Sequence, residues 1–174
     1  MDWDWFDKYQ TFIAGLLGFL GVIATIRSNG EQNRGLLIEQ VNQESRALRR
    51  ALIEELSLVA NTYKTNIEDL SKSNNPHGIA YLPENPHIAA YGQLVPRFGL
   101  LDTEEIKKTM LAYQLIQELP DRFRLLQPQD SKACRDGFIT IERQDYATVV
   151  EIYDSFLSPV LEAIELLGRG EKTS

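Results

Sequence analysis

An uncharged stretch near the N-terminus constrains the fold of this chain more than any other sequence feature. No charged side chain occurs between Phe12 and Ile26, and polar but uncharged residues extend the stretch back to position 9. A helix of roughly 17 to 25 mainly apolar residues is needed to cross a bilayer. Residues 9–26 fall at the short end of this range, and we predict that they form a transmembrane helix.

The two flanks of this stretch suit the membrane–water interfaces. Trp3, Trp5 and Tyr9 lie at its N-terminal edge, where amphipathic rings favour the headgroup level. Arg27 closes the other edge, and its long side chain can extend to the interface. These four residues are the predicted membrane-interface anchors.

The distribution of basic residues predicts the orientation. Lys8 alone precedes the stretch, whereas Arg27, Arg34, Arg46, Arg49 and Arg50 follow it. The side of a membrane protein that is richer in Lys and Arg stays in the cytoplasm. The sequence therefore predicts a single-pass protein of the cell inner membrane, with residues 1–8 outside and the following domain in the cytoplasm.

Three other interpretations of the stretch stay open. A cleaved signal peptide would start with basic residues, whereas this chain starts with Asp2, Asp4 and Asp7 against Lys8 alone. A buried helix of a soluble domain is compatible with the strictly apolar part, which is shorter than about 18 residues. An interfacial helix would need a polar face, and no charge interrupts residues 9–26.

Small residues form a seam along the predicted transmembrane helix. Ala14, Gly18, Gly21 and Thr25 recur at steps of four, three and four, so they share one helical face. Small side chains let helices approach closely in lipid. We predict helix–helix packing along this small-residue seam, with a partner helix or a second copy of the chain. The alternative explanation is that glycine is common in membrane helices.

Composition and absent motifs restrict the function. The formal charge of −7 argues against a nucleic-acid partner, since phosphates need a basic surface. The single cysteine, Cys134, excludes an internal disulfide. The sequence contains no glycine-rich phosphate loop, GxSxG, HExxH, CxxC or EF-hand pattern. It therefore predicts no catalytic residue, no cofactor and no metal ligand.

Residues 27–35 connect the stretch to the rest of the chain. They contain Gly30 and Gly35 among polar residues, which predicts a juxtamembrane hinge. A helix that runs straight through is the alternative, because an isolated glycine costs only about 1 kcal/mol relative to alanine. A cytosolic helical domain is expected at residues 36–168, followed by a flexible tail at 169–174.

The first helix of this domain is predicted at residues 36–70. Its apolar or small residues follow a repeat of four, four and three, close to the period of a straight helix. These residues are Leu37, Val41, Ser45, Leu48, Leu52, Leu56, Val59, Tyr63, Ile67 and Leu70. The arginines at 46, 49 and 50 are assigned to a solvated face, where Glu54 and other acidic residues lie within one turn.

Two further helices are predicted. Asp102 and Glu105 form a capping box that starts a helix at residues 103–119, and Pro120 is expected to end or kink it. The last helix, at residues 143–167, is expected to stop at Gly168.

The three amphipathic helices must bury their apolar faces against one another. We predict an all-α antiparallel helical bundle with the long first helix as its spine. The proline-rich segment 71–99 is expected to cross over one end of the bundle. Phe138–Ile141 is interpreted as a packed lead-in to the last helix rather than as a short strand.

Several pieces of the chain resemble a group of small bacterial inner-membrane proteins. These are residues 5–15 (WFDKYQTFIAG), residues 47–56 (ALRRALIEEL), and Tyr91 followed by residues 98–102 (FGLLD) and Tyr113. The resemblance implies one N-terminal span and a helical cytosolic domain without an established activity. It carries over no functional residue.

Three functions are compatible with these features. The first is a membrane-anchored interaction or regulatory protein that binds a protein partner at the inner face of the membrane. The second is an oligomeric membrane effector, such as a pore or membrane-disrupting subunit, that assembles through the small-residue seam. The third is an enzyme whose site uses His77, His87, Cys134 or carboxylates of the irregular segments 71–99 and 127–142.

Overall fold

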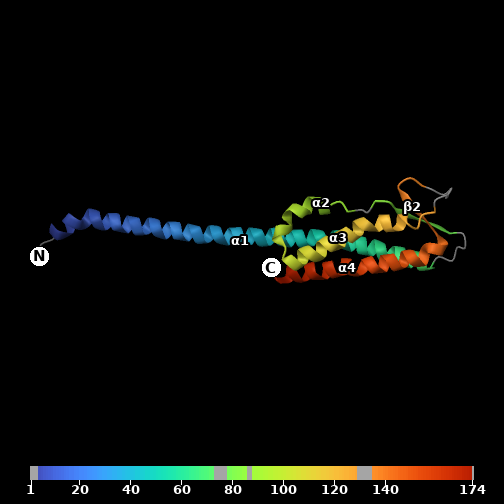
Figure 1. The fold of residues 1–174 in the computed structure, drawn as a ribbon. Coiled ribbons are helices and arrows are strands. Elements are labelled where there is room, and N and C mark those ends of the chain that lie inside the picture. Colours follow the sequence, from blue (N-terminus) through green and yellow to red (C-terminus); the bar gives the residue numbers. More distant parts are fainter. Residues whose placement is uncertain (1–3, 73–77, 86–87, 129–134, 174) are drawn as a thin grey trace. The chain divides into compact units, whose positions relative to one another are not determined.

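The computed structural model describes residues 4–72, 78–85, 88–128 and 135–173 of the chain. These residues form, in order, α1 (Asp4–Lys72), β1 (Ile79–Pro83), α2 (Tyr91–Leu94), η1 (Val95–Leu100), α3 (Thr103–Arg124), β2 (Phe138–Glu142), η2 (Arg143–Asp145) and α4 (Tyr146–Thr173) (Figure 1). Helices dominate, which confirms the predicted all-α class. The chain divides into two compact units, Met1–Gln43 and Glu44–Ser174.

Helix α1 continues through residues 27–35 without interruption. The straight-through alternative is therefore the one that the structure shows, in place of a break at the predicted hinge. Two isolated glycines weaken a helix by only about 1 kcal/mol each, which neighbouring helical residues can offset. A side chain added at Gly35 would meet no atom within 4 Å, so close packing does not require glycine there.

The core of the second unit confirms most of the predicted stripe on α1. Its buried side chains run from Ser45 through Leu48, Leu52, Leu56, Val59 and Tyr63 to Leu70. Leu37 and Val41 belong to the same repeat but are exposed, and they lie in the first unit. The repeat therefore describes a buried face only from Ser45 onward.

The helices of the bundle do not all alternate in direction. Helix α4 runs antiparallel to α1, since Arg50 pairs with Glu171 whereas Asn66 bonds to Tyr153. Helix α3 runs parallel to α1. Arg49 pairs with Glu105 near the start of α3, and Glu55, further along α1, accepts from Tyr113, which is also further along α3.

The predicted antiparallel packing is thus correct for α4 and wrong for α3. A parallel pair needs a long connection. The described residues between α1 and α3 return along the bundle rather than crossing over one end. Two contacts trace this return within the described residues. The backbone N–H of Ala90 donates to Glu55, and the hydroxyl of Ser45 donates to the carbonyl of Leu100.

The run interpreted as a lead-in is strand β2. It pairs antiparallel with β1, and Leu82 lies opposite Ile139. Ile139 and Ile141 are buried, so the strand carries part of the core. The tight turn before β2 places Gly137 at φ 78°, a conformation that glycine adopts without steric cost. The partner strand β1 lies in the proline-rich segment. The sequence does not predict this strand, because proline within a run of residues argues against a strand.

Two helices extend beyond their predicted C-terminal ends. Helix α3 continues past Pro120 to Arg124, and α4 continues past Gly168 to Thr173. Proline removes one backbone donor, but the buried side chains of Leu119 and Phe123 on either side keep this part of α3 against the core. The tail predicted at residues 169–174 is helical as far as Thr173.

Candidate functional site

An apolar surface lies on α1 in the first unit. Leu36, Leu37, Ile38 and Val41 are between 51% and 69% exposed, and we call these four residues the 36–41 face. Phe19, Val22 and Ile23 are exposed further toward the N-terminus. Contiguous exposed apolar residues mark surfaces that contact a protein, a ligand or a membrane. The 36–41 face is therefore the first candidate for a functional surface.

The predicted membrane residues fall only partly within the structure. Trp3 lies outside the described residues, as do the side chains of Trp5, Tyr9, Ala14 and Gly18. Gly21, Thr25 and Arg27 are described and exposed. Among the side chains that the structure describes, no helix carries a stretch that is both long and apolar enough to span a membrane.

Thr25 and Gly21 are joined within the helix. The hydroxyl of Thr25 donates to the carbonyl of Gly21, four residues earlier, at 2.9 Å. This bond uses the only hydrogen-bond donor that the Thr25 side chain carries. A side chain added at Gly21 would meet no atom within 4 Å of the described structure. Both members of the seam that are described therefore present a free helical surface.

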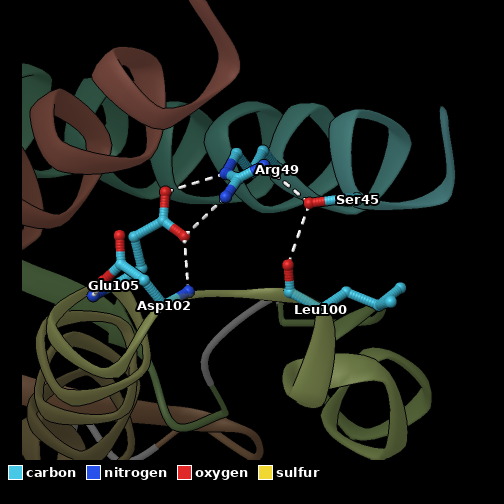
Figure 2. Close-up of polar contacts among 5 residues, drawn as sticks. All are labelled: Ser45, Arg49, Leu100, Asp102 and Glu105. Carbon is cyan, nitrogen blue, oxygen red and sulfur yellow. Dashed lines mark hydrogen bonds and ion pairs between the residues drawn. The ribbon is translucent and has the colours of Figure 1, made fainter. Parts of the chain in front are cut away.

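The second unit contains a buried ionic cluster that links α1 to the start of α3. Nε and Nη2 of Arg49 donate to the two carboxylate oxygens of Glu105, at 2.7 and 2.9 Å (Figure 2). Nη1 of Arg49 donates to the hydroxyl of Ser45 at 2.6 Å, and that hydroxyl donates to the carbonyl of Leu100 at 2.9 Å. Glu105 is 0% exposed.

Glu105 serves two structures at once. Its carboxylate accepts the backbone N–H of Asp102 at 2.9 Å, and its own N–H donates to the Asp102 side chain at 2.8 Å, which confirms the predicted capping box. A buried charge is costly unless it is paired and hydrogen-bonded. Here the cap and Arg49 together satisfy the carboxylate, so the cluster fixes the N-terminus of α3 against α1.

Gly170 of α4 closes over this cluster. A side-chain carbon added there would lie 2.0 Å from Oε1 of Glu105 and 2.7 Å from Nε of Arg49. Neither atom can move freely, because both belong to the bidentate pair. Any larger residue at position 170 would therefore force the buried pair or α4 to shift.

We expect Gly170→Ala to lower the free energy of unfolding by about 1 to 3 kcal/mol, because the new methyl group overpacks the buried pair. Gly168→Ala is the matched control, since a side chain at Gly168 meets no atom within 4 Å. It should leave stability unchanged or raise it slightly, by helix propensity. Urea unfolding followed by circular dichroism measures both variants, and equal effects would contradict this role of Gly170.

A second buried carboxylate lies further along α1. Glu55 accepts from the backbone N–H of Ala90 and from the hydroxyl of Tyr113, both at 2.6 Å. The ring of Tyr113 stacks on that of Tyr91, with 4.0 Å between the ring centroids. Burial, followed by the hydrogen bond to Glu55, raises the pKa of Tyr113 above its ordinary value. The tyrosine therefore stays a neutral donor, and Glu55 ties α2 and α3 to α1.

The prediction that Arg49 shares a solvated face with Arg46 and Arg50 is wrong for Arg49. Arg49 is buried with Glu105, while Arg50 is exposed and pairs with Glu171 rather than with Glu54. A signal was present in the sequence, because Arg49 lies four residues after Ser45 and directly after Leu48, both on the stripe. The partner of Arg49 could not be read from this spacing.

The residues proposed for an enzyme site are mostly not described. His77, His87 and Cys134 lie outside the described residues. Of the described carboxylates in or near those segments, Asp121 and Asp136 are exposed. The described part of the chain contains no group of three or more His, Cys, Asp or Glu residues that could hold a metal ion.

Comparison with known proteins adds no relative. No protein family, no curated protein and no solved structure matches this chain.

Proposed function

We propose that this chain is a membrane-anchored helical interaction protein. In this proposal residues 9–26 cross the inner membrane, and the helical domain binds a protein partner at the cytoplasmic face. The observation that carries the proposal is the 36–41 face, which is exposed between the uncharged stretch and the buried core of the second unit. The buried stripe of the second unit starts at Ser45, which follows this face in the sequence.

The spacing of the 36–41 face fits a helical partner. Val41 lies four residues after Leu37 and three residues after Ile38 on α1. Spacings of three and four residues bring side chains to one helical face, as in helices that anchor in an apolar groove or against another helix. Polar side chains flank it, since Asn33 and Arg34 precede it and Gln43 donates to Glu39 at 2.9 Å. An apolar strip with a polar border is typical of a protein contact.

Membrane anchoring is supported by the uncharged stretch, and the internal bond of Thr25 is compatible with it. In hydrocarbon, a hydroxyl without a partner costs free energy, and a threonine that bonds to a carbonyl of its own helix avoids this cost. The basic residues that follow the stretch favour a cytoplasmic domain.

The first experiment tests the anchor with the full chain. After cell fractionation and a carbonate wash, the protein is expected to stay in the membrane pellet. Release of the full-length chain into the soluble fraction would contradict the anchor.

The second experiment tests the face by purification from detergent-solubilised membranes. Leu37→Glu combined with Val41→Glu should abolish co-purification of the partner, because two charges would enter the apolar contact. Asn33→Glu combined with Gln40→Glu is the matched control, since it adds the same charge to exposed polar positions of the same segment. If both double variants retain or lose the partner equally, the 36–41 face is not the binding surface.

A second candidate function is an oligomeric membrane effector. Its supporting observation is the free surface at Gly21, where nothing in the described structure would oppose a neighbouring helix. Gly18→Leu combined with Gly21→Leu should then abolish chemical cross-linking between copies in membranes, along with any membrane permeabilisation. Unchanged cross-linking would leave the seam as ordinary glycine content.

A further inference from the structure

A cavity opens between the helices of the second unit, at the end of the bundle near β1. Its volume is about 160 Å³. Its floor is formed by buried side chains of three helices, among them Tyr63 of α1, Ile116 and Phe123 of α3, and Tyr153 of α4. Exposed residues, including Leu58, Thr62 and Asn85, form its rim. The cavity is therefore deep and apolar but reachable from solvent.

The wall of this cavity carries no charge. None of its described lining residues is Asp, Glu, Lys, Arg or His. A charged ligand would leave water without a counter-charge, which is unfavourable. The aromatic side chains of the floor also contact one another, since the ring of Tyr153 lies 5.0 Å from that of Tyr63 and 5.0 Å from that of Phe123. This lining suits an uncharged aromatic ligand, which can meet these rings edge to face.

Asn66 and Tyr153 add polar groups to the wall of the cavity. Nδ2 of Asn66 donates to the hydroxyl of Tyr153 at 2.9 Å. Burial raises the pKa of Tyr153 to about 12, so its hydroxyl keeps its proton at neutral pH. Tyr153 accepts from Asn66, and no described residue accepts the proton of its hydroxyl. The buried hydroxyl of Tyr63 has no hydrogen-bond partner among the described residues. The wall therefore has donor capacity that a ligand oxygen could use.

The volume limits the size of the ligand. An engineered apolar cavity of about 150 Å³ in another protein binds benzene. We propose that this cavity binds an uncharged molecule with one aromatic ring and one hydroxyl or carbonyl oxygen, with the oxygen accepting from Tyr153. Every described wall residue belongs to Glu44–Ser174, so this binding is independent of the membrane anchor.

The experiment uses the full chain in detergent micelles, with 4-fluorophenol and fluorobenzene as probes and ¹⁹F NMR as the readout. The wild type should bind 4-fluorophenol with a dissociation constant of roughly 1 mM, as expected for so small a ligand. Leu58→Trp, which places an indole at the exposed rim, should weaken binding at least about tenfold. Leu161→Trp is the matched control, because this exposed leucine is not part of the wall. Since both variants share the same micelles, probe partitioning into detergent cancels in the comparison.

A separate variant tests whether the hydroxyl of Tyr153 donates to the ligand oxygen. Tyr153→Phe removes the donor and leaves the ring, so it should abolish the preference for 4-fluorophenol over fluorobenzene while fluorobenzene still binds. Retained fluorobenzene binding also shows that the variant is folded. The proposal is overturned if the wild type binds neither probe, or if Leu58→Trp binds as the wild type does. An unchanged preference in Tyr153→Phe would overturn the role of Tyr153.

Discussion

Replacing Arg49 by methionine is expected to lower the free energy of unfolding by about 3 to 5 kcal/mol, the cost of breaking a buried ion pair. Methionine fills much of the same space but leaves the carboxylate of Glu105 without a cation, at a position that is 0% exposed. It also removes the donor to Ser45, whose hydroxyl holds the carbonyl of Leu100, the last residue of η1 before α3. Chemical unfolding of the full chain, followed by circular dichroism, measures the change.

Two variants separate the buried charge from general damage. Arg49→Met combined with Glu105→Leu should recover much of the loss, because neither charge is then left alone in the core. Recovery should be incomplete, since Asp102 loses its capping partner. Arg122→Met breaks the exposed pair with Glu118 and should cost no more than about 1 kcal/mol. A loss in Arg49→Met as small as in Arg122→Met would show that the cluster does not hold α3 in place.

Features encoded by neighbouring residues could be predicted from the sequence. The capping box needs only Asp102 and Glu105, three residues apart, and its two hydrogen bonds form as expected. The stripe from Ser45 to Leu70 follows from helical periodicity, and its members are buried or partly buried. In both cases the physical cause lies within a few turns of one helix.

Features that join distant segments were missed. Arg49 lies 56 residues from Glu105, and periodicity does not say which acidic residue meets an arginine. The same holds for the direction of α3, because a proline-rich connection can either cross one end of a bundle or return along it. Strand β1 was not recognised, since its hydrogen bonds come from β2 much later in the chain. Gly170 falls in the predicted flexible tail, but it belongs to α4, where a side chain would clash with Glu105 and Arg49.

The candidate surface could be predicted only in part. The sequence places Leu37 and Val41 on the same stripe as Leu48 and Leu52, and so predicts that all four are buried. The repeat cannot indicate where its partner helices end. Only the structure shows that the buried stripe begins at Ser45, whose hydroxyl donates to the carbonyl of Leu100. The residues of the 36–41 face precede Ser45 and are exposed.

The second large effect concerns the core of the bundle. Leu52→Ala is expected to lower the free energy of unfolding by about 2 to 5 kcal/mol, because Leu52 is 0% exposed and its removal leaves a cavity that the surrounding helices fill only partly. Leu56→Ala should behave alike, since Leu56 lies one turn further on the same buried stripe.

Leu58→Ala supplies the matched control for these two variants. It removes the same atoms from the same helix, but Leu58 is 68% exposed, and surface substitutions usually change stability by no more than about 0.5 kcal/mol. The contrast between Leu52 and Leu58 isolates burial from helix propensity, because alanine favours the helix equally in both variants. Equal midpoints of urea unfolding in Leu52→Ala and Leu58→Ala would mean that α1 does not face α3 and α4 through this stripe.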